Sequence, residues 1–349
     1  MKDISIGIIN LQHSKNYGAL VQAYALQEVL NDNGLKNKTI DFRPRKSRVI
    51  FKVKETAKKI LNKEDVFDDF RNRNINLTPI LTNSEDLDFS DFSVFITGSD
   101  QVWRPRYTNP NAEVYFLNFG NSDVKKISYA ASFGVDHWEE EFVGHKETDR
   151  IKELVNDFDH ISVREASGVS ICQEQFGSEA VHVLDPTLLA GRQVFERLLV
   201  ENRDKSRSSG GLVYYKLDHD QCFIDEIERI SDKYKIEKNN IYRPGKYIPV
   251  CAWLESIKNA DLVITDSFHG VCFCLIFNKN FICVVNKDRG RSRLESLLSL
   301  VGLKERLVDR LDSSIDETIN KSIDYNKVNN LIEQLRQYSL DWLIKSVNG

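Results

Sequence analysis

The sequence predicts an α/β protein of two doubly wound domains, each with a parallel sheet covered by helices on both faces. Short apolar runs rich in β-branched and aromatic residues alternate with amphipathic segments, which is the pattern of successive βαβ units. The length of 349 residues exceeds that of a usual single domain, so two hydrophobic cores are expected. Between the two series of units, residues 201–211 (ENRDKSRSSGG) have the charge, serine and glycine content of a linker.

The first domain is expected over residues 1–200, where strand-like runs alternate with helical segments. Each run is short and ends near a polar or glycine-containing turn. Doubly wound sheets bind ligands at such turns, because the carboxyl ends of their strands meet at one edge. The expected strands are residues 4–9, 38–42, 93–97, 127–131, 160–163 and 181–184, and the clearest helices are residues 19–31 and 166–175.

The second domain is expected over residues 212–324. Its strand-like runs are residues 212–216, 262–265 and 281–285, and residues 221–234 have the pattern of a helix. Residues 325–349 carry a long amphipathic pattern, which predicts a C-terminal helix. By analogy with other two-domain α/β enzymes, we expect this helix to pack back on the first domain.

Composition excludes several classes of function. A net charge of −4 lacks the excess of Lys and Arg that would neutralise a nucleic acid, so none is expected as a partner. The first apolar run is too short for a signal peptide, and no segment approaches the roughly 18 apolar residues of a membrane span, so a cytoplasmic protein is expected. Six cysteines without C-x-x-C spacing predict buried thiols, and we expect no disulfide, metal or cofactor.

One strongly basic segment, residues 43–63, begins at Arg43 and ends at Lys63. It holds nine Lys and Arg and a single Glu within an amphipathic pattern. Such a segment can rest on an anionic membrane surface or bind a lipid diphosphate, which predicts peripheral contact with the inner face of the membrane. The alternative is a solvated helix face neutralised by the acidic residues that follow.

The loop after the first strand is a candidate binding site. It contains Asn16, Tyr17 and Gly18 and leads directly into a helix. The unpaired N–H groups of a helix N-terminus can hold a phosphate, a carboxylate or a sugar hydroxyl. The loop matches neither G-x-G-x-x-G nor a Walker sequence, so it does not predict dinucleotide or ATP binding. The alternative is structural, with Asn16 as helix cap and Gly18 permitting close packing.

A second polar turn follows the strand at 93–97. Ser99, Asp100 and Gln101 offer short polar groups, and Trp103 offers an apolar plate of the kind that stacks on sugar rings. We therefore expect acceptor binding here. Alternatively, Asp100 caps a helix and Trp103 lies in the core.

Arg164 directly follows the strand at 160–163. A planar guanidinium at the end of a strand suits a carboxylate or phosphate, so Arg164 is predicted to bind an anion. The alternative is an ion pair with Glu165 or an aspartate.

The strand at 262–265 ends in Asp266-Ser267-Phe268-His269-Gly270, and an almost wholly apolar segment follows. This order predicts that His269 lies at the carboxyl edge of a buried sheet, beside a helix N-terminus. An imidazole at such a position can exchange protons near neutral pH. A hydrolase is not indicated, because no G-x-S-x-G elbow is present.

Three arginines follow the strand at 281–285. Arg289, Arg291 and Arg293 lie close to Ser292 at the start of a predicted helix, an arrangement that can bind an anion. A solvated surface loop is the alternative, and the sequence does not decide which arginine faces inward.

Five strings occur along the chain in this order: NYGALVQAYALQ, FITGSDQVW, SVREASG, VLDPTLL and ITDSFHG. With them the chain closely resembles the polysaccharide pyruvyl transferase family, from its first strand to about Arg306. The resemblance implies a GT-B-like fold, in which two Rossmann-like domains face each other across a cleft. It also implies transfer of the pyruvyl group of phosphoenolpyruvate to two hydroxyls of a glycan, without a metal required by the fold.

The resemblance implies roles for the donor side. His269 matches the motif histidine of the family, an acid/base group or a contact to phosphoenolpyruvate. Other members place an arginine two residues before this histidine, in an R-L-H-G string, where this chain has Ser267. Positive charge must then come from elsewhere. The expected donor-binding residues are Arg164, Arg289, Arg291, Arg293, Ser267 and Gly270.

The acceptor implied by the resemblance is a sugar diol of a cell-surface polysaccharide or of its lipid-linked or nucleotide-linked precursor. The expected acceptor-binding residues are Asn16, Tyr17, Gly18, Ser99, Asp100, Gln101 and Trp103. Two alternatives stay open: a glycosyltransferase that uses a nucleotide sugar, and a non-catalytic glycan-binding module.

Overall fold

The computed structural model describes residues 4–44, 65–83, 91–119, 123–202, 210–218, 220–285 and 290–349. These fall into two compact units, Met1–Leu189 with Ser339–Gly349 and Ala190–Tyr338. Three features predicted from the sequence lie outside the described residues. They are most of the expected linker, the basic segment after Pro44, and Arg289. Among the described residues, no helix combines the length and the apolar composition needed to cross a bilayer.

The boundary between the units lies within helix α8 (Pro186–Glu201), earlier than the expected boundary at residue 200. Gly191 interrupts this helix with a left-handed backbone (φ 70°), a conformation that glycine adopts without a steric penalty. Leu189 and Ala190, on either side of the boundary, directly precede this kink. The change of unit therefore takes place at a kinked helix.

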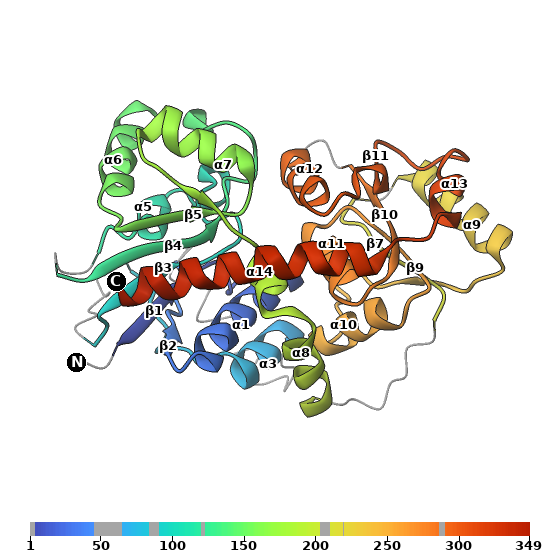
Figure 1. The fold of residues 1–349 in the computed structure, drawn as a ribbon, viewed down its shortest axis with the longest axis horizontal. Helices are drawn as coiled ribbons and strands as arrows, with labels where there is room; N and C mark the ends of the chain where they lie inside the picture. Colours follow the sequence, from blue (N-terminus) through green and yellow to red (C-terminus); the bar gives the residue numbers. More distant parts are fainter. Residues whose placement is uncertain are drawn as a thin grey trace. The chain divides into compact units, whose positions relative to one another are not determined.

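The first unit is built on a six-stranded parallel sheet in the order β2-β1-β3-β4-β5-β6 (Figure 1). The chain first moves from β1 to β2 on one side and then to β3 on the other, so the topological switch point lies between β1 and β3. The strands are β1 (Ser5–Ile9), β2 (Lys36–Thr39), β3 (Val94–Thr97), β4 (Lys125–Ala131), β5 (His160–Val163) and β6 (Val181–His182).

Helices of the first unit connect these strands. The best buried is α1, because most of its residues are apolar on every side and lie in the core. The helices and helical turns are α1 (Tyr17–Asp32), α3 (Val66–Asn74), α4 (Pro105–Thr108), α5 (Ala112–Tyr115), η2 (Glu140–Phe142), α6 (His145–Asn156), α7 (Ala166–Ile171) and the π-helical turn η3 (Cys172–Phe176).

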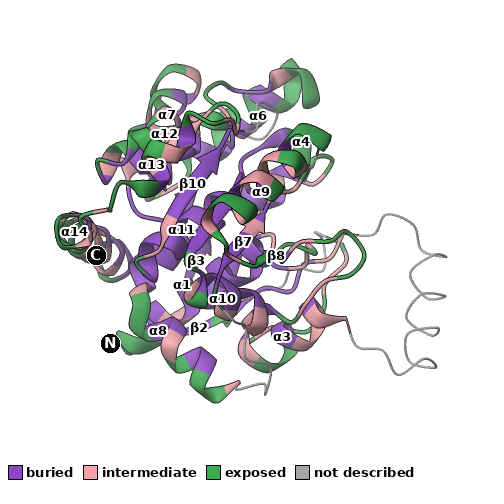
Figure 2. Ribbon diagram, turned by 90° about the vertical axis from the view of Figure 1, so that its right-hand side faces the viewer, coloured by how far each residue is buried: buried purple, intermediate pink, exposed green. Residues whose placement is uncertain are grey.

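The second unit contains a five-stranded parallel sheet in the order β11-β10-β9-β7-β8. Its switch point lies between β7 and β9. The strands are β7 (Leu212–Tyr215), β8 (Lys238–Asn240), β9 (Leu262–Thr265), β10 (Asn280–Val284) and β11 (Leu307–Val308). The helices are α9 (Gln221–Tyr234), α10 (Val250–Asn259), α11 (Phe268–Ile276), α12 (Arg291–Leu300), the turn η4 (Lys304–Arg306) and α13 (Ile315–Asn320). Figure 2 shows that α11 is buried along its whole length.

The last helix, α14 (Tyr325–Asn348), ends in the first unit. The Ser339 hydroxyl accepts a hydrogen bond from the Leu184 N–H (3.0 Å), and the Trp342 ring lies 6.3 Å from the Tyr129 ring. Lys125 donates to the carbonyl of Val347 (3.2 Å). The C-terminal turns thus complete the core beside β4.

Both sheets are parallel and covered by helices, so the predicted fold class is confirmed. The cysteine prediction is partly wrong, because Cys222 is exposed and Cys251 is half-buried, whereas the other four are buried; all six thiols are free. That the two units face each other across a cleft stays a prediction.

Candidate functional site

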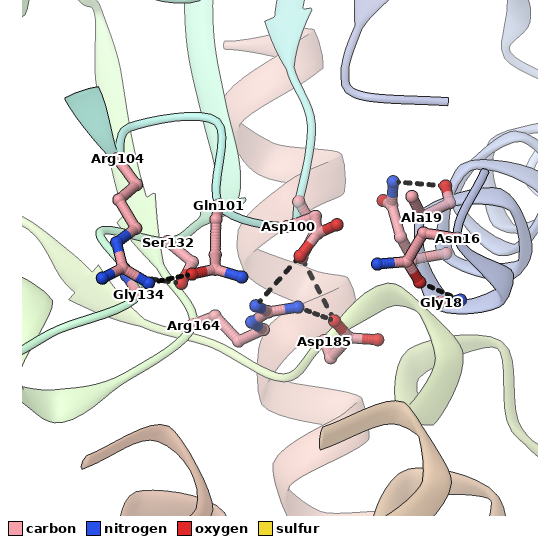
Figure 3. Close-up of polar contacts among 12 residues, drawn as sticks. Asn16, Gly18, Ala19, Asp100, Gln101, Arg104, Ser132, Gly134, Arg164 and Asp185 are labelled. Atoms are coloured by element: carbon pink, nitrogen blue, oxygen red, sulfur yellow. Dashed lines mark hydrogen bonds and ion pairs between the residues drawn. The ribbon is translucent and has the colours of Figure 1, made fainter. Parts of the chain in front are cut away.

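In the first unit, polar residues gather where parallel strands end at one edge of the sheet. Asn16 follows β1, Asp100 follows β3, Ser132 follows β4 and Arg164 follows β5. Figure 3 shows that these segments converge, with Asp100, Arg164 and Asp185 at the centre of the group. The position at the switch point agrees with the general rule for ligand sites in doubly wound sheets.

Arg164 is the centre of a buried charge cluster. Its Nη1 donates to Asp185 Oδ2 at 2.8 Å, Nη2 lies 3.5 Å from Asp100 Oδ1, and Nε lies 4.0 Å from Glu165 Oε2. Burial alone lowers the pKa of Arg164, but Asp185, Asp100 and Glu165 outweigh this effect and raise it above the ordinary value. The guanidinium is therefore fixed in its charged form.

The carboxylates of this cluster are themselves held in place. Asp185 accepts hydrogen bonds from the Ser99 hydroxyl (3.2 Å) and from the N–H and hydroxyl of Thr187 (2.9 and 2.6 Å). Glu165 Oε1 accepts from the Ser132 hydroxyl and from the N–H of Phe133, both at 2.9 Å. These bonds stabilise the charged carboxylates and limit their movement.

The cluster corrects the role expected for Arg164. Three carboxyl groups surround this one guanidinium, so the group offers no net positive charge to a doubly charged phosphate. The structure shows the ion pair that was the alternative, with Asp185 as the aspartate. We therefore assign Arg164 to the positioning of Asp100 and Asp185 rather than to donor binding.

Asp100 has a strained backbone. Its φ is 73°, and its carbonyl accepts from the N–H of Val102 (2.7 Å) and of Ser132 (3.0 Å). A non-glycine residue in this region costs free energy that the surrounding bonds must offset. Asp100 is not the helix cap that the sequence left open. It is a fixed carboxylate at the sheet edge.

Trp103 does not form the expected sugar-stacking surface. Its side chain has 0% exposure, its Nε1 donates to the carbonyl of Tyr115 (3.1 Å), and its ring stacks on Phe116 at 5.1 Å. A ring without exposed surface cannot contact an acceptor, so the role predicted for Trp103 is wrong and its alternative place in the core is correct. Ser99 is also buried, with its hydroxyl on Asp185, whereas Gln101 is half-buried.

The loop after β1 forms the expected helix start. Asn16 is exposed and accepts from the Gly18 N–H (2.9 Å), so it caps α1. Tyr17 is buried with its ring 5.0 Å from Phe67, and Gly18 is buried as well. The structural alternative thus accounts for these three residues, and a ligand at this helix N-terminus stays a prediction.

Sequence reasoning missed Arg71, which fixes the same loop. Arg71 lies on α3, is buried, and donates from Nε and Nη2 to the carbonyl of Gln12 (3.1 and 2.9 Å). Burial lowers its pKa, with Asp68 opposing that effect. The Gln12 amide in turn donates to Asp41 (2.9 Å). The signal in the sequence is an arginine among apolar neighbours on one helix face, next to Phe67 and Phe70.

In the second unit, a chain of hydrogen bonds shapes the turn between β9 and α11. The Thr265 hydroxyl donates to the carbonyl of Tyr215 (2.6 Å) and accepts from the N–H of Ser267 (3.0 Å). The Ser267 hydroxyl accepts from the N–H of Gly270 (3.2 Å), so Ser267 caps α11. A Cβ at Gly270 would lie 2.6 Å from the Thr265 hydroxyl, so packing requires glycine there. Donor contacts by Ser267 and Gly270 stay predictions.

His269 lies in the first turn of α11, as the sequence predicts, and is buried. Its ring meets the Phe268 ring at 5.4 Å and 86°. The guanidinium carbon of Arg293 also lies 5.9 Å from the centre of the Phe268 ring. Imidazole, phenyl ring and guanidinium therefore form one group at the carboxyl edge of the second sheet.

The structure distinguishes the arginines of α12. Arg293 is buried with 8% exposure, whereas Arg291 is exposed and pairs with Glu295 (2.6 Å) and Asp309 (2.5 Å). The hydrogen bond to Glu295 and that to Asp309 raise the pKa of Arg291. Arg293 is thus the inward-facing arginine and Arg291 the outward-facing one. Within the described part of the chain, no group of His, Cys, Asp and Glu side chains is arranged to hold a metal ion.

The model of one protein family, polysaccharide pyruvyl transferase, matches residues 16–288. The chain belongs to this family. The matched range contains the Arg164 cluster and His269 and ends before Arg293. Because Arg293 lies outside the matched range, its position beside Phe268 is known from the structure of this chain and not from the family match. No curated protein sequence matches the chain.

Solved structures show the same fold at low identity. The UDP-GlcNAc 2-epimerase of Neisseria meningitidis bound to UDP-GlcNAc is 10% identical, with a TM-score of 0.52 over 99% of this chain and 94% of that chain. The S. aureus MnaA structure with UDP is also 10% identical, with a TM-score of 0.51 over 96% of this chain and 90% of that chain. These likenesses show that the chain has a GT-B-like fold.

Proposed function

We propose that the chain transfers the enolpyruvyl carbons of phosphoenolpyruvate to two hydroxyls of one sugar in a cell-surface polysaccharide or its precursor, forming a pyruvate ketal and releasing phosphate. The observation that supports this most is the group of His269, Phe268 and Arg293 at the carboxyl edge of the second sheet, in a chain that belongs to the polysaccharide pyruvyl transferases. This group places an imidazole, which can transfer protons, near a buried guanidinium.

Charge supports placing the donor at this group. Phosphoenolpyruvate carries a phosphate and a carboxylate, and both need fixed positive charge. A buried guanidinium interacts with an anion more strongly than an exposed one, because less water screens it. Arg293 is the buried arginine of α12, and we assign it to the donor. Arg291 is already paired with two carboxylates, so its contribution is smaller, and a contact by Arg289 remains part of the proposal.

His269 is proposed to move the protons of the reaction. It donates a proton to C3 of phosphoenolpyruvate, which becomes a methyl group, and C2 takes on oxocarbenium character. The first sugar hydroxyl adds to C2 and loses its proton to the imidazole. Phosphate then leaves as the C2–O bond to it breaks, and the second hydroxyl closes the ketal, its proton leaving with the phosphate. We propose this reaction without a metal or an organic cofactor.

The acidic edge of the first unit suits the acceptor. Sugar hydroxyls donate hydrogen bonds, and a fixed carboxylate such as Asp100 accepts them. The same carboxylates repel phosphoenolpyruvate. We therefore propose Asp100, Gln101 and Asn16 as acceptor contacts, with buried Ser99 and Arg164 as positioning residues.

Isotope transfer tests the proposal. The chain is incubated with carbon-labelled phosphoenolpyruvate and a panel of lipid-linked and nucleotide-linked sugars, and products are analysed by mass spectrometry together with released phosphate. The proposal predicts a labelled sugar heavier by one pyruvate minus one water, in step with phosphate. Phosphoenolpyruvate binding without labelled product would favour a non-catalytic glycan-binding module instead.

A nucleotide-sugar glycosyltransferase is the second candidate, because the two solved structures above contain UDP-GlcNAc and UDP. Calorimetry with phosphoenolpyruvate and with UDP-GlcNAc compares the two donors. A nucleotide-linked acceptor would bind under either hypothesis, so the label transfer decides between them. We also retain peripheral membrane contact through the basic segment as a proposal, which vesicle flotation with anionic lipid tests.

A further inference from the structure

Two exposed aromatic rings lie on contacting turns of the first unit. Tyr107 on α4 is 46% exposed and Phe142 on η2 is 38% exposed, and these two elements contact each other. Exposed large aromatic side chains are uncommon in the described part of this chain, where Tyr338 is a third. Two of them therefore lie on adjoining turns, and solvent can reach both rings.

Buried charges hold these turns together. Arg104 donates from Nε and Nη2 to both oxygens of Glu139, each at 3.0 Å, and both side chains are buried. The guanidinium carbon of Arg104 also lies 4.7 Å from the centre of the Tyr107 ring. The Asn109 amide donates to the carbonyl of Phe142. These contacts hold the turns that carry the rings in place, so less conformational entropy is lost when a ligand binds.

A cation accompanies the rings. The exposed Arg106 places its guanidinium carbon 5.7 Å from the centre of the Phe142 ring. A guanidinium over a ring presents N–H donors beside an apolar face. A sugar ring offers the complementary groups, with C–H bonds on one face and hydroxyls around its edge.

Buried Arg104 links Tyr107 to one of the proposed acceptor residues, Gln101. Gln101 Oε1 accepts from Arg104 Nη1 at 3.0 Å, and both residues lie against Gly134 (Figure 3). The segment that carries α4 follows the carboxyl end of β3, and the segment that carries η2 follows that of β4. Tyr107 is therefore connected through Arg104 and Gln101 to the edge where Asp100 lies.

We propose that Tyr107, Arg106 and Phe142 form a subsite for the sugar units that flank the modified sugar of the acceptor polysaccharide. The proposal rests on the proposed function, because it extends the same acceptor site. Two rings and one arginine are too small for a stable protein partner, which needs about 800 Å² on each side. They match one or two pyranose rings, and the family acts on polysaccharides.

Binding without donor tests the subsite. The full chain is titrated with monosaccharides and hexasaccharides of β-1,4-linked glucose, β-1,4-linked N-acetylglucosamine and β-1,3-linked galactose. We expect at least one hexasaccharide to bind about tenfold more tightly than its monosaccharide, and Tyr107→Ala and Phe142→Ala each to remove most of that difference. Tyr338→Ala, which removes a tyrosine that is 53% exposed in the other unit, is the matched control and should bind as the parent chain does.

Two results would overturn the subsite: no hexasaccharide that binds more tightly than its monosaccharide, or Tyr107→Ala and Phe142→Ala variants that keep the preference. The thermal midpoint of each variant is measured first, and we expect little change because the removed rings are exposed. No phosphoenolpyruvate is present, so failure of pyruvyl transfer leaves this outcome unaffected. Conversely, the parent chain could form the ketal while the Tyr107→Ala and Phe142→Ala variants keep the preference for the hexasaccharide. That result would reject the subsite and support the proposed function.

Discussion

The guanidinium carbon of Arg293 lies 5.9 Å from the centre of the Phe268 ring, and the same ring meets the His269 imidazole at 5.4 Å between centres. One phenyl ring therefore lies near both a buried cation and a group that can transfer protons. Arg293 and Phe268 come from different βα connections of the second sheet, so this group depends on the tertiary fold.

Arg293→Ala is expected to raise the KM for phosphoenolpyruvate by roughly 10- to 100-fold, because a charge-assisted contact to the donor is lost. Steady-state kinetics at fixed acceptor measures this. Arg291→Ala is the matched control on the same helix, and its exposed side chain predicts a change of less than about threefold. Equal effects of the two substitutions would contradict the assignment.

Asp100→Asn is expected to raise the KM for the acceptor by roughly tenfold and to leave that for phosphoenolpyruvate unchanged, because a carboxylate accepts hydroxyl hydrogen bonds more strongly than an amide does. The asparagine tolerates the positive φ of this position, so folding is preserved. If the KM for phosphoenolpyruvate rises instead, the division of substrates between the two sheet edges is wrong.

Trp103→Ala is expected to lower the free energy of unfolding by about 3–5 kcal/mol, because it leaves a cavity beside Phe116 and an unpaired carbonyl on Tyr115. Urea denaturation measures the loss. Trp103→Phe keeps most of the ring contacts and should lose less. A Trp103→Ala variant as stable as the parent chain, with weaker acceptor binding, would restore the surface role that the sequence suggested.

His182 is expected to make stability depend on pH. Burial lowers its pKa below 6.5, although the hydrogen bond to the carbonyl of Arg164 (2.9 Å) and Glu165 raise it in part. The unfolded chain then binds a proton that the folded chain does not, so stability falls as the pH drops below about 6.5, by at most about 1.4 kcal/mol per pH unit from this group.

His182→Gln removes that contribution and can still donate to the Arg164 carbonyl. Its unfolding free energy should therefore decline less between pH 7.5 and 5.5 than that of the parent chain, as urea titrations at several pH values will show. If the unfolding free energies of the two proteins decline in parallel, His182 is protonated equally in the folded and unfolded states, which would contradict the prediction.

The strands that could be predicted from the sequence are those with mostly apolar residues. β3 and β9 were found because a parallel strand buried on both faces is mostly apolar. β8 has the sequence KNN and β11 has two residues, so only pairing with β7 and β10 defines them. Such edge strands have no compositional signal.

The candidate site was predictable to the extent that strand ends locate it. His269 follows a buried strand and lies in the first turn of an apolar helix, so its place at the sheet edge could be derived from local order. Arg164 and Trp103 could not be assigned, because their burial depends on Asp185 and Phe116, whose contacts arise only in the folded chain. The choice between Arg291 and Arg293 depends likewise on which side of α12 meets Phe268.

The proposed mechanism depends on proton transfer from His269 to C3 of the donor, and His269→Ala is expected to lower turnover by roughly 100-fold or more while the fold is preserved. The most direct measurement is the NMR spectrum of the product made in D₂O. We expect a pyruvate ketal whose methyl group carries one deuterium, formed by the parent chain and nearly abolished in the variant. A product that keeps the vinyl CH₂ of phosphoenolpyruvate, or equal rates for the two proteins, would contradict the proposed mechanism.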